Sequence, residues 1–222
     1  MLVPVLGRPH RVGPTLDAFA AATPEPHRVL FIVSEHDEDE VQALDWAGAE
    51  YLVTERARST YACKINDGYH DTTEPFVFTA ADDLLPHDGW LTRAVTRMAS
   101  RPGLGVVGTD DGGLNPRVAK GQHSVHSLIR RSYVERHSLV FDAPDSIFHE
   151  GYRHAFCDDE MIRRARSLHA YVHAPDAVVE HLHPHVDKAP WDAVYELGRE
   201  GHEHDRDLLR ARRRAMRQSR GR

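Results

Sequence analysis

Phe76-Val-Phe-Thr-Ala-Ala-Asp-Asp-Leu-Leu-Pro86 combines a run of strand-forming apolar residues with two adjacent aspartates. The apolar run predicts a buried strand over residues 76–80, and Asp82 and Asp83 follow where that strand ends. Ligands of open α/β sheets bind beyond the carboxyl ends of the strands, and hard divalent cations prefer carboxylate oxygens. The stretch therefore predicts an α/β protein with a cation site at the edge of its sheet.

Alternating strands and helices flank this stretch. Hydrophobic runs predict strands over 3–6, 29–33, 50–54 and 105–108, and helical composition predicts helices over 15–22, 39–47, 59–69 and 90–98. The short connections between them indicate an α/β fold with a largely parallel sheet. The first two strands end at Pro4 and Glu35, so polar groups gather where this fold places its ligands.

The length, composition and cysteine count limit the class of protein to which the chain can belong. A chain of 222 residues with 41% apolar residues suits one domain, predicted over residues 1–190, with a helical extension over 191–222. No apolar run approaches the roughly 20 residues that span a bilayer, and the apolar start lacks the features of a signal peptide. The two cysteines, Cys63 and Cys157, lack metal-type spacing, so we expect a cytoplasmic protein.

Charge is distributed unevenly along the chain. The net charge is −6, yet residues 206–222 contain eight arginines and one acid, which gives this tail +7 and leaves −13 for residues 1–205. The arginines recur every three to four residues from Arg206 to Arg217, so a helix would align several of them on one face. Such a face suits nucleic-acid phosphates or an anionic surface. The alternative is a solvated basic end.

Four segments carry a family resemblance. They are Val3-Pro-Val-Leu-Gly-Arg-Pro9, Ala62-Cys-Lys-Ile-Asn-Asp-Gly68, Ala80-Ala-Asp-Asp83, and Asp158-Asp-Glu-Met-Ile-Arg-Arg164 followed by Ala174-Pro-Asp-Ala-Val-Val-Glu-His181. In this order they resemble the GT-A-fold, nucleotide-sugar glycosyltransferases of the family-two type. The resemblance covers roughly residues 2–185 and is greatest to compact versions encoded by actinobacteria and their phages. It implies a Rossmann-like, mostly parallel sheet flanked by helices.

The resemblance implies a nucleotide-sugar site, with a UDP-sugar as the expected donor. Pro4 would line the nucleotide pocket, Glu35 would contact the base, and Lys64 and Asn66 would lie near the diphosphate. Arg130 or its neighbour would contact the diphosphate or a phosphate-bearing acceptor. As alternatives, Glu35 lies in a solvated acidic loop, Lys64 is an exposed helix lysine, and the arginine is exposed or paired with a glutamate.

The same resemblance implies a Mn²⁺ or Mg²⁺ site. The family pattern is Asp-x-Asp, so Ala80 replaces the first aspartate, Asp82 matches the metal-binding one, and Asp83 assists directly or through water. His181 would be the second protein ligand. Two alternatives stay open: the aspartates form a cap or turn, or the run from His181 to His185 binds zinc.

Asp158 is the implied catalytic base. A family-two enzyme inverts the anomeric carbon in one displacement, and a carboxylate takes the proton of the acceptor hydroxyl. Cys157 replaces the glutamate that usually precedes this aspartate. Asp158 also suits the start of a helix, where the macrodipole favours acids, and the two roles are compatible.

The arginine tail extends the hypothesis to an acceptor. A phage enzyme that glycosylates hydroxymethylated pyrimidines of DNA in the host cytoplasm could use the tail to bind the DNA phosphates.

Two other classes of protein stay open. The first is a sugar-nucleotide-binding domain without catalysis, because Ala80 and Cys157 each replace an expected acid. The second is a nucleic-acid-binding protein acting through its tail, against which the −13 body argues.

Overall fold

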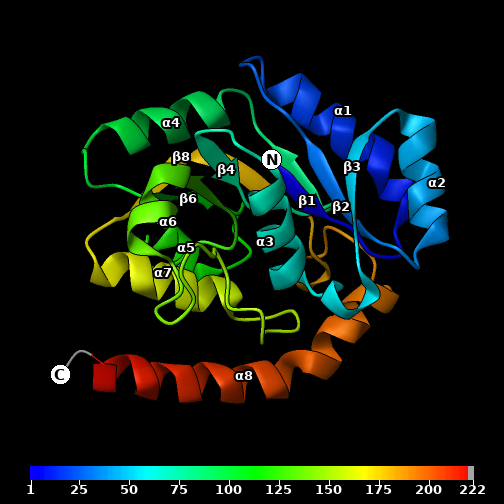
Figure 1. Cartoon of the computed structure of the whole chain (residues 1–222). Coiled ribbons are helices and arrows are strands. Elements are labelled where there is room, and N and C mark those ends of the chain that lie inside the picture. The colour runs from blue at the N-terminus through cyan, green and yellow to red at the C-terminus, as the bar shows by residue number, and fades with distance from the viewer. Residues whose placement is uncertain (220–222) are drawn as a thin grey trace.

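The computed structural model describes residues 1–219, so Arg220 and Arg222 of the predicted tail lie outside the described residues. The chain folds around two sheets that meet edge to edge (Figure 1). The strands are β1 (Leu2–Pro4), β2 (Leu30–Ser34), β3 (Glu50–Thr54), β4 (Phe76–Phe78), β5 (Leu84–Pro86), β6 (Val106–Asp110), β7 (Ser127–Arg130) and β8 (Tyr171–His181).

The strand order gives a mixed sheet with a parallel half. β1, β2 and β3 form a parallel sheet, and β4-β7-β6-β8-β5 form the second sheet. Within the second sheet β6 and β8 are parallel, while β5 and β7 run antiparallel to their neighbours. A bridge between Leu2 and Thr79 joins the two sheets. The short strands β5 and β7 are absent from the sequence-based prediction.

Helices cover both faces of the sheets. They are α1 (Val12–Ala22), α2 (Glu38–Ala47), α3 (Tyr61–Asp71), α4 (Trp90–Ala99), α5 (Pro116–Ala119), α6 (Arg131–His137), α7 (Cys157–Ser167) and α8 (Ala193–Ser219), with single 3₁₀ turns at Pro9–Arg11, Arg56–Arg58 and Pro184–Val186. Alternate residues of a strand point to opposite faces. Accordingly Leu30 and Ile32 pack with α3, α6 and α7, whereas Phe31 and Val33 pack with α1, α2 and α4. The result is a three-layer α/β domain.

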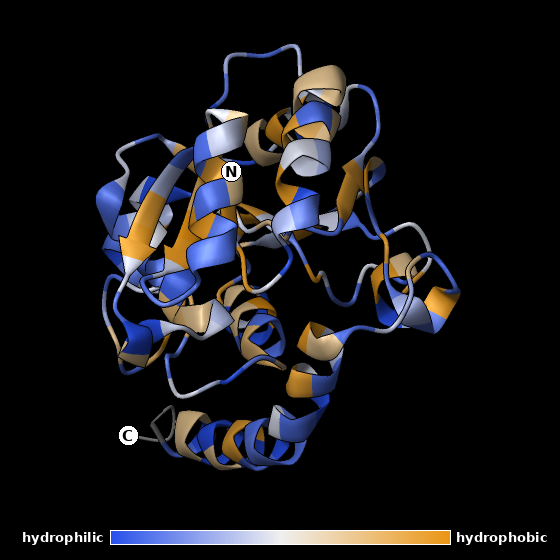
Figure 2. Cartoon of the chain, turned by 90° about the vertical axis from the view of Figure 1, so that its right-hand side faces the viewer, coloured by the Kyte–Doolittle hydropathy of each residue, from blue (hydrophilic) through white to orange (hydrophobic). Residues whose placement is uncertain are grey.

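The C-terminal helix α8 runs along one side of this domain, next to α7 (Figure 1). Leu209 joins the core of the domain, and the turns of α8 alternate between hydrophilic and hydrophobic residues (Figure 2). The buried carboxylate of Asp205 accepts hydrogen bonds of 2.8–2.9 Å from the backbone N–H groups of residues 153, 154 and 155. The predicted extension therefore packs against the domain and anchors the loop that leads into α7.

Arg212 of the tail lies inside the protein. Its guanidinium pairs with the buried Glu160 of α7 at 2.6 Å and with Asp142 at 2.7 Å. Tyr152 also donates to Glu160. This arginine is committed to the fold and is not part of a basic outer face.

Among residues 1–219, no helix is both long and apolar enough to cross a membrane.

Candidate active site

A cavity of about 660 Å³ opens where the carboxyl ends of the strands meet the start of α7 and the first turns of α8. It lies at the position predicted for ligands in an open α/β sheet. Six of the predicted site residues line it, and four of these come from β1, from α3 and from the segment before β5: Pro4, Lys64, Asp82 and Asp83. The other two are Asp158 and His181.

Asp83 and His181 face each other in this cavity. Leu84 of β5 pairs with His181 of β8, and Leu182 N–H donates to the Asp83 carbonyl oxygen at 2.8 Å. This register places His181 Nε2 3.2 Å from Asp83 Oδ2, to which the Tyr195 hydroxyl of α8 donates at 2.8 Å. Burial raises the pKa of Asp83, but His181 and Tyr195 outweigh it and hold that pKa below its usual range. Asp83 is therefore an ionised carboxylate.

Whereas Asp83 contacts His181, the predicted metal ligand Asp82 is paired with Arg8. Its Oδ1 accepts from Arg8 Nη1 at 3.0 Å, and Arg8 also pairs with Asp192 at 2.9 Å and stacks on the Tyr195 ring. Burial and the charge of Asp83 raise the pKa of Asp82 to about 6. The pairing of β5 with β8 explains the difference, because it brings the residue directly before β5 to His181.

Ala80, which replaces an expected aspartate, is fully buried. Its carbonyl oxygen accepts from the Tyr61 hydroxyl at 3.1 Å, and its N–H donates to Leu2 at 2.9 Å. The position joins the two sheets and presents no polar side chain to the cavity. This position therefore contributes no side-chain oxygen to a bound ligand.

Asp158 occupies the first turn of α7 and is held in a defined orientation. His123 Nε2 lies 3.1 Å from Asp158 Oδ2, and Asp159 N–H donates to Asp158 Oδ1 at 2.8 Å. Burial raises the pKa of Asp158, but the His123 charge and hydrogen bond outweigh it and give a net lowered pKa. Phe156 precedes the helix with φ of +66°, a left-handed conformation that marks a constrained turn. The arrangement keeps Asp158 ionised and fixed.

Lys64 is buried beneath the cavity. Its Nζ donates to the Val5 carbonyl oxygen at 2.6 Å, and burial lowers its pKa to about 8. The alternative of an exposed helix lysine is wrong, since only 1% of Lys64 is exposed. A buried ammonium next to Pro4 places positive charge on the sheet side of the cavity.

Three predicted site residues lie apart from the cavity lining. Glu35 accepts from Arg56 N–H at 3.1 Å at the end of β2. Asn66 is buried, and its amide bonds the backbone of residues 147 and 148 as well as Glu150. Arg130 donates to the carbonyl oxygens of residues 98 and 104 and lies over the Phe76 ring. The next arginine, Arg131, likewise bonds residues 69, 72 and 74.

The cavity lining also contains five residues that the sequence motifs did not indicate. They are Arg8, His123, His126, His154 and Tyr195. Arg8 belongs to a motif that resembles the family, but nothing in the motif indicates its pairing with Asp82. The two histidines at 123 and 126 follow a glycine-rich loop, and only the pairing of β7 with β4 and β6 brings them to the cavity. His154 and Tyr195 arrive through the docking of α8.

Unpartnered buried atoms indicate that the cavity suits a cation. In the part of the chain that the structure describes, Asp83 Oδ1 and His181 Nδ1 have no hydrogen-bond partner. His126 Nδ1 donates to the Thr79 carbonyl oxygen at 2.9 Å, which leaves a lone pair on its unpartnered Nε2, and burial lowers its pKa to about 4. Buried polar atoms normally have partners, and a carboxylate and imidazoles are ligand types that divalent cations accept. Within residues 1–219, however, Asp83, His126 and His181 do not form a set whose ligand atoms all lie within 4.8 Å of one another.

The zinc alternative finds less support. The rings of His183 and His185 stack at 4.8 Å, and His183 lies 5.3 Å from His181. Within residues 1–219, the three-residue set with ligand atoms within 4.8 Å of one another is His123, Asp158 and Asp159, not the three histidines. The carboxylate–imidazole contact in that set has the length of a hydrogen bond, as expected of a positioned base.

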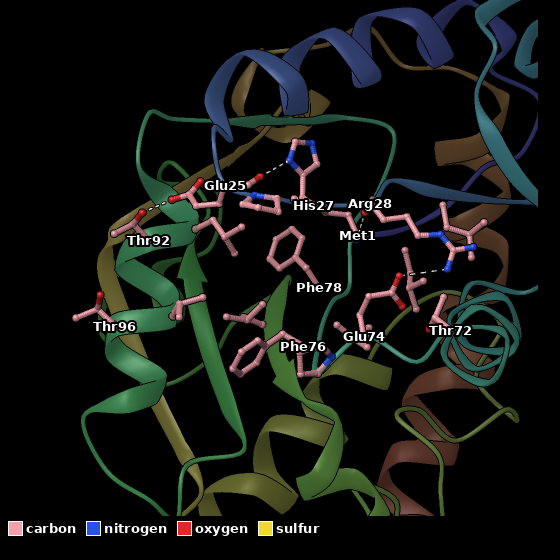
Figure 3. A pocket seen from close by; sticks show the side chains of 18 residues that line it. Met1, Glu25, His27, Arg28, Thr72, Glu74, Phe76, Phe78, Thr92 and Thr96 are labelled. Atoms are coloured by element: carbon pink, nitrogen blue, oxygen red, sulfur yellow. Dashed lines mark hydrogen bonds and ion pairs between the residues drawn. The ribbon is translucent and has the colours of Figure 1, made fainter.

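A second cavity, of about 430 Å³, lies where β1 and β4 diverge (Figure 3). Phe76 and Phe78 belong to its lining, and an ion pair between Arg28 and Glu74 and a hydrogen bond between Thr92 and Glu25 flank it. It gathers no set of catalytic groups comparable to the first cavity. We therefore assign the chemistry to the cavity that contains Asp83 and Asp158.

Comparisons with known proteins give matches at the level of the fold. No family model matches the sequence, and no curated protein matches it. The mannosyltransferase PcManGT from Pyrobaculum calidifontis, solved in complex with GDP-Man and Mn²⁺, is similar with a TM-score of 0.61 and 18% identity, over 82% of this chain and 56% of that one. The chain thus spans little more than half of that protein.

Glucosyl-3-phosphoglycerate synthase from Mycobacterium tuberculosis is similar over a larger share. Its complex with Mn²⁺, UDP and glucosyl-3-phosphoglycerate has a TM-score of 0.62 and 15% identity, over 95% of this chain and 78% of that one. At these identities the likeness shows the fold. The sheet order, the flanking helices and the position of the cavity are those of a Rossmann-like α/β domain, and the chain has the GT-A fold.

Proposed function

We propose that this protein is a metal-dependent glycosyltransferase that moves a sugar from a nucleoside-diphosphate sugar to an acceptor hydroxyl. The observation that carries the proposal is the placement of two chemically different carboxylates in one cavity. Asp83 lies with His181 on the sheet side, and Asp158 lies with His123 at the start of α7. The similar solved proteins bind GDP-Man or UDP together with Mn²⁺.

Asp83 and His181 would hold Mn²⁺ or Mg²⁺, which offsets the charge that develops on the departing nucleoside diphosphate. The sequence-based choice, Asp82, stays a candidate ligand beside Asp83, since Arg8 Nη1 lies 3.0 Å from Asp82 and 3.6 Å from Asp83. Lys64, beside Pro4, contributes positive charge near the expected diphosphate. We propose Pro4 as a wall of the nucleotide pocket, while Glu35, Asn66 and Arg130 would have to change their present hydrogen bonds to contact the donor.

Asp158 accepts the proton of the acceptor hydroxyl as that oxygen attacks the anomeric carbon. Its other contacts, to His123 and to the backbone of Asp159, fix the carboxylate while leaving it ionised at neutral pH. A single attack opposite the leaving group inverts the anomeric configuration. Positioned general bases contribute about 10²–10⁴-fold to such steps.

Substitution of the base tests the proposal. Asp158→Asn should lower transfer by at least about 10²-fold and should preserve the stabilisation of the protein by Mn²⁺ with the donor nucleotide. Transfer would be followed with a panel of UDP-, GDP- and dTDP-sugars, starting with UDP-sugars, and product NMR would report the anomeric configuration. Transfer near the wild-type rate would remove Asp158 from the role of base.

We further propose hydroxymethylated pyrimidines in DNA as an acceptor to test, as would suit a phage enzyme. The exposed arginines of α8 support this choice: Arg206, Arg210, Arg214 and Arg217. Arg212 does not contribute, because it is paired inside the protein. Incorporation of labelled sugar into hydroxymethylated DNA, with unmodified DNA as control, would support it. Labelling of neither DNA would exclude it.

A sugar-nucleotide-binding domain without catalysis is the second candidate. The buried Ala80 and the buried Cys157, in place of acids, are the observations that favour it. It predicts binding of a nucleotide sugar with neither transfer nor hydrolysis of the donor. A nucleic-acid-binding protein acting through α8 alone is less compatible with the anchoring of that helix by Asp205 and Arg212.

A further inference from the structure

A third cavity, which is polar and has a volume of about 520 Å³, lies between α7 and α8. We call it the arginine pocket. Its charged members are Arg117, Arg163, Arg166, Arg213, Arg217 and Asp159. Ile162 and Met216 provide an apolar floor. The volume falls in the range of roughly 300–1,000 Å³ typical of small-molecule sites.

The arginine pocket holds far more positive than negative charge. Five guanidinium groups share one lining carboxylate, Asp159, which pairs with Arg117 at 2.9 Å and lies 3.7 Å from Arg213. Arg213 Nε is buried and has no hydrogen-bond partner among the described residues. Within residues 1–219, neither Arg163 nor Arg217 makes a side-chain hydrogen bond or ion pair, whereas Arg212, the residue before Arg213, is fully paired.

The guanidinium groups are close enough to repel one another. Burial and the charges of Arg213, Arg217 and Arg117 lower the pKa of Arg163, against a smaller opposing effect of Asp159. Helices α7 and α8 thus bring like charges together at a cost to the fold. Such a cluster of fork-shaped donors matches the oxygen geometry of phosphate, which arginine binds through paired hydrogen bonds.

The arginine pocket adjoins the candidate active site. Asp159 lines both cavities and follows the proposed base in sequence. One carboxylate oxygen of Asp159 lies 4.0 Å from His123, the partner of Asp158, and the other contacts Arg117. An acceptor whose hydroxyl reaches Asp158 can therefore extend its anionic part across Asp159 toward the arginines.

We propose that the arginine pocket binds phosphate groups of the acceptor and so selects phosphate-bearing acceptors for the reaction. The inference rests on the proposed glycosyl transfer, and it assigns the pocket a chemistry distinct from that of the donor site. The phosphate belongs either to a small phosphorylated molecule or to a nucleic-acid backbone. The body charge of −13 for residues 1–205 opposes an extended polyanion and favours the small molecule.

A charge-matched pair of variants tests the proposal. Arg163→Gln with Arg217→Gln removes two unpaired guanidinium groups of the pocket, and Arg206→Gln with Arg214→Gln removes two exposed arginines that do not line it. Binding of glycerol 3-phosphate and of a short single-stranded DNA would be measured by calorimetry, in EDTA to suppress metal-dependent binding at Asp83. We expect at least about tenfold weaker phosphate binding in the pocket variant, because it loses two guanidinium groups that can donate charge-assisted hydrogen bonds to phosphate.

Each outcome has a defined meaning. If the pocket variant, and not the control variant, loses binding of glycerol 3-phosphate, the proposal is supported with a small acceptor. If the pocket variant, and not the control variant, loses binding of DNA, it is supported with a nucleic-acid acceptor. Equal binding by both variants, or none by the wild type, overturns it. Stabilisation of the pocket variant by Mn²⁺ with UDP or GDP is the separate readout of the donor site. If that stabilisation is absent from wild type and variants alike, the proposed function itself fails.

Discussion

At the scale of single residues, the contact between Asp158 and His123 defines how the proposed base works. A carboxylate with a lowered pKa is a weak base, yet it is fully ionised at neutral pH and needs no proton removed before reaction. His123 is 98% buried and has a raised pKa, because the charges of Asp158 and Asp159 outweigh the effect of burial. We interpret His123 as a positioning residue that acts through Asp158.

Replacement of His123 by glutamine should separate its effect on the pKa of Asp158 from its effect on the orientation of that carboxylate. The pKa of Asp158 should rise once the neighbouring charge is lost, so the acid limb of the kcat/KM profile should move to higher pH. The rate on the plateau should fall by about tenfold as the carboxylate loses its fixed orientation. The pH–rate profile measures both, with exposed His169→Gln as control. An unmoved acid limb would contradict the assignment.

Glu40 predicts a pH dependence of stability. It is fully buried, accepts from Arg8 N–H at 2.7 Å, and has a pKa raised to about 7 by burial. Between the unfolded pKa and this folded value, the folded state binds more protons, so the free energy of unfolding falls as pH rises. The largest slope from one such proton is about 1.4 kcal/mol per pH unit.

Glu40→Gln should therefore remove part of the decline in the free energy of unfolding between pH 5 and 8. Chemical denaturation at several pH values would show it, since the variant should be relatively more stable at pH 8 than at pH 5. Glu38→Gln, at the exposed start of the same helix, is the matched control. Parallel curves for wild type and Glu40→Gln would show that Glu40 is ionised throughout.

At the scale of elements, α8 is part of the site and not an appendage. Tyr195 contacts Asp83, Asp205 binds the loop before Asp158, and Arg213 reaches the arginine pocket. Gly198 explains how the helix comes so close: a Cβ there would lie 2.7 Å from His154. Glycine costs a helix about 1 kcal/mol relative to alanine, and here it permits this packing.

Removal of the Asp205 carboxylate should disconnect this helix from the site. Asp205→Ala leaves three backbone N–H groups without their acceptor, and each buried unsatisfied group costs about 1–3 kcal/mol. We expect about 3 kcal/mol or more of lost stability, with loss of transfer. Denaturant unfolding and transfer assays would measure these effects.

The matched control is Asp207→Ala, which removes an exposed pair with Arg210 of the kind that contributes little. A loss of stability as small as that of the control would show that the loop holds without Asp205. A loss of stability with normal transfer would show that the loop's position does not govern the base.

At the scale of the whole molecule, ligand binding to the folded state should stabilise the entire domain. Mn²⁺ with the correct nucleotide at about 100 times its Kd adds about 2.7 kcal/mol. For a chain of this size that corresponds to a rise in Tm of roughly 5–10 °C. Thermal unfolding would show the rise, and EDTA should reverse it. A rise that survives EDTA would place the nucleotide elsewhere than at a metal site.

Sequence reasoning predicted the fold more completely than the site. Long apolar runs and helical segments predict most of the α/β order, and β3 has the predicted bounds. The strands β5 and β7 are three and four residues long and show no usable periodicity. Motif spacing indicated Asp82, and the pairing of β5 with β8 brings Asp83 into contact with His181, a contact that no local pattern encodes. Contacts from α8 depend on tertiary packing that no local pattern encodes.

The route of α8 also limits how this chain can change during evolution. One residue turns a helix by about 100°, and about seven residues are needed to restore the same face two turns later. An insertion or deletion of one, two, five or six residues between Asp205 and Arg213 would keep Tyr195 in place while rotating the arginines by about 100° or more away from α7. On the proposed roles, homologues with such length changes should keep the donor site and lose the arginine pocket. The length of α8 therefore predicts which relatives share this pocket.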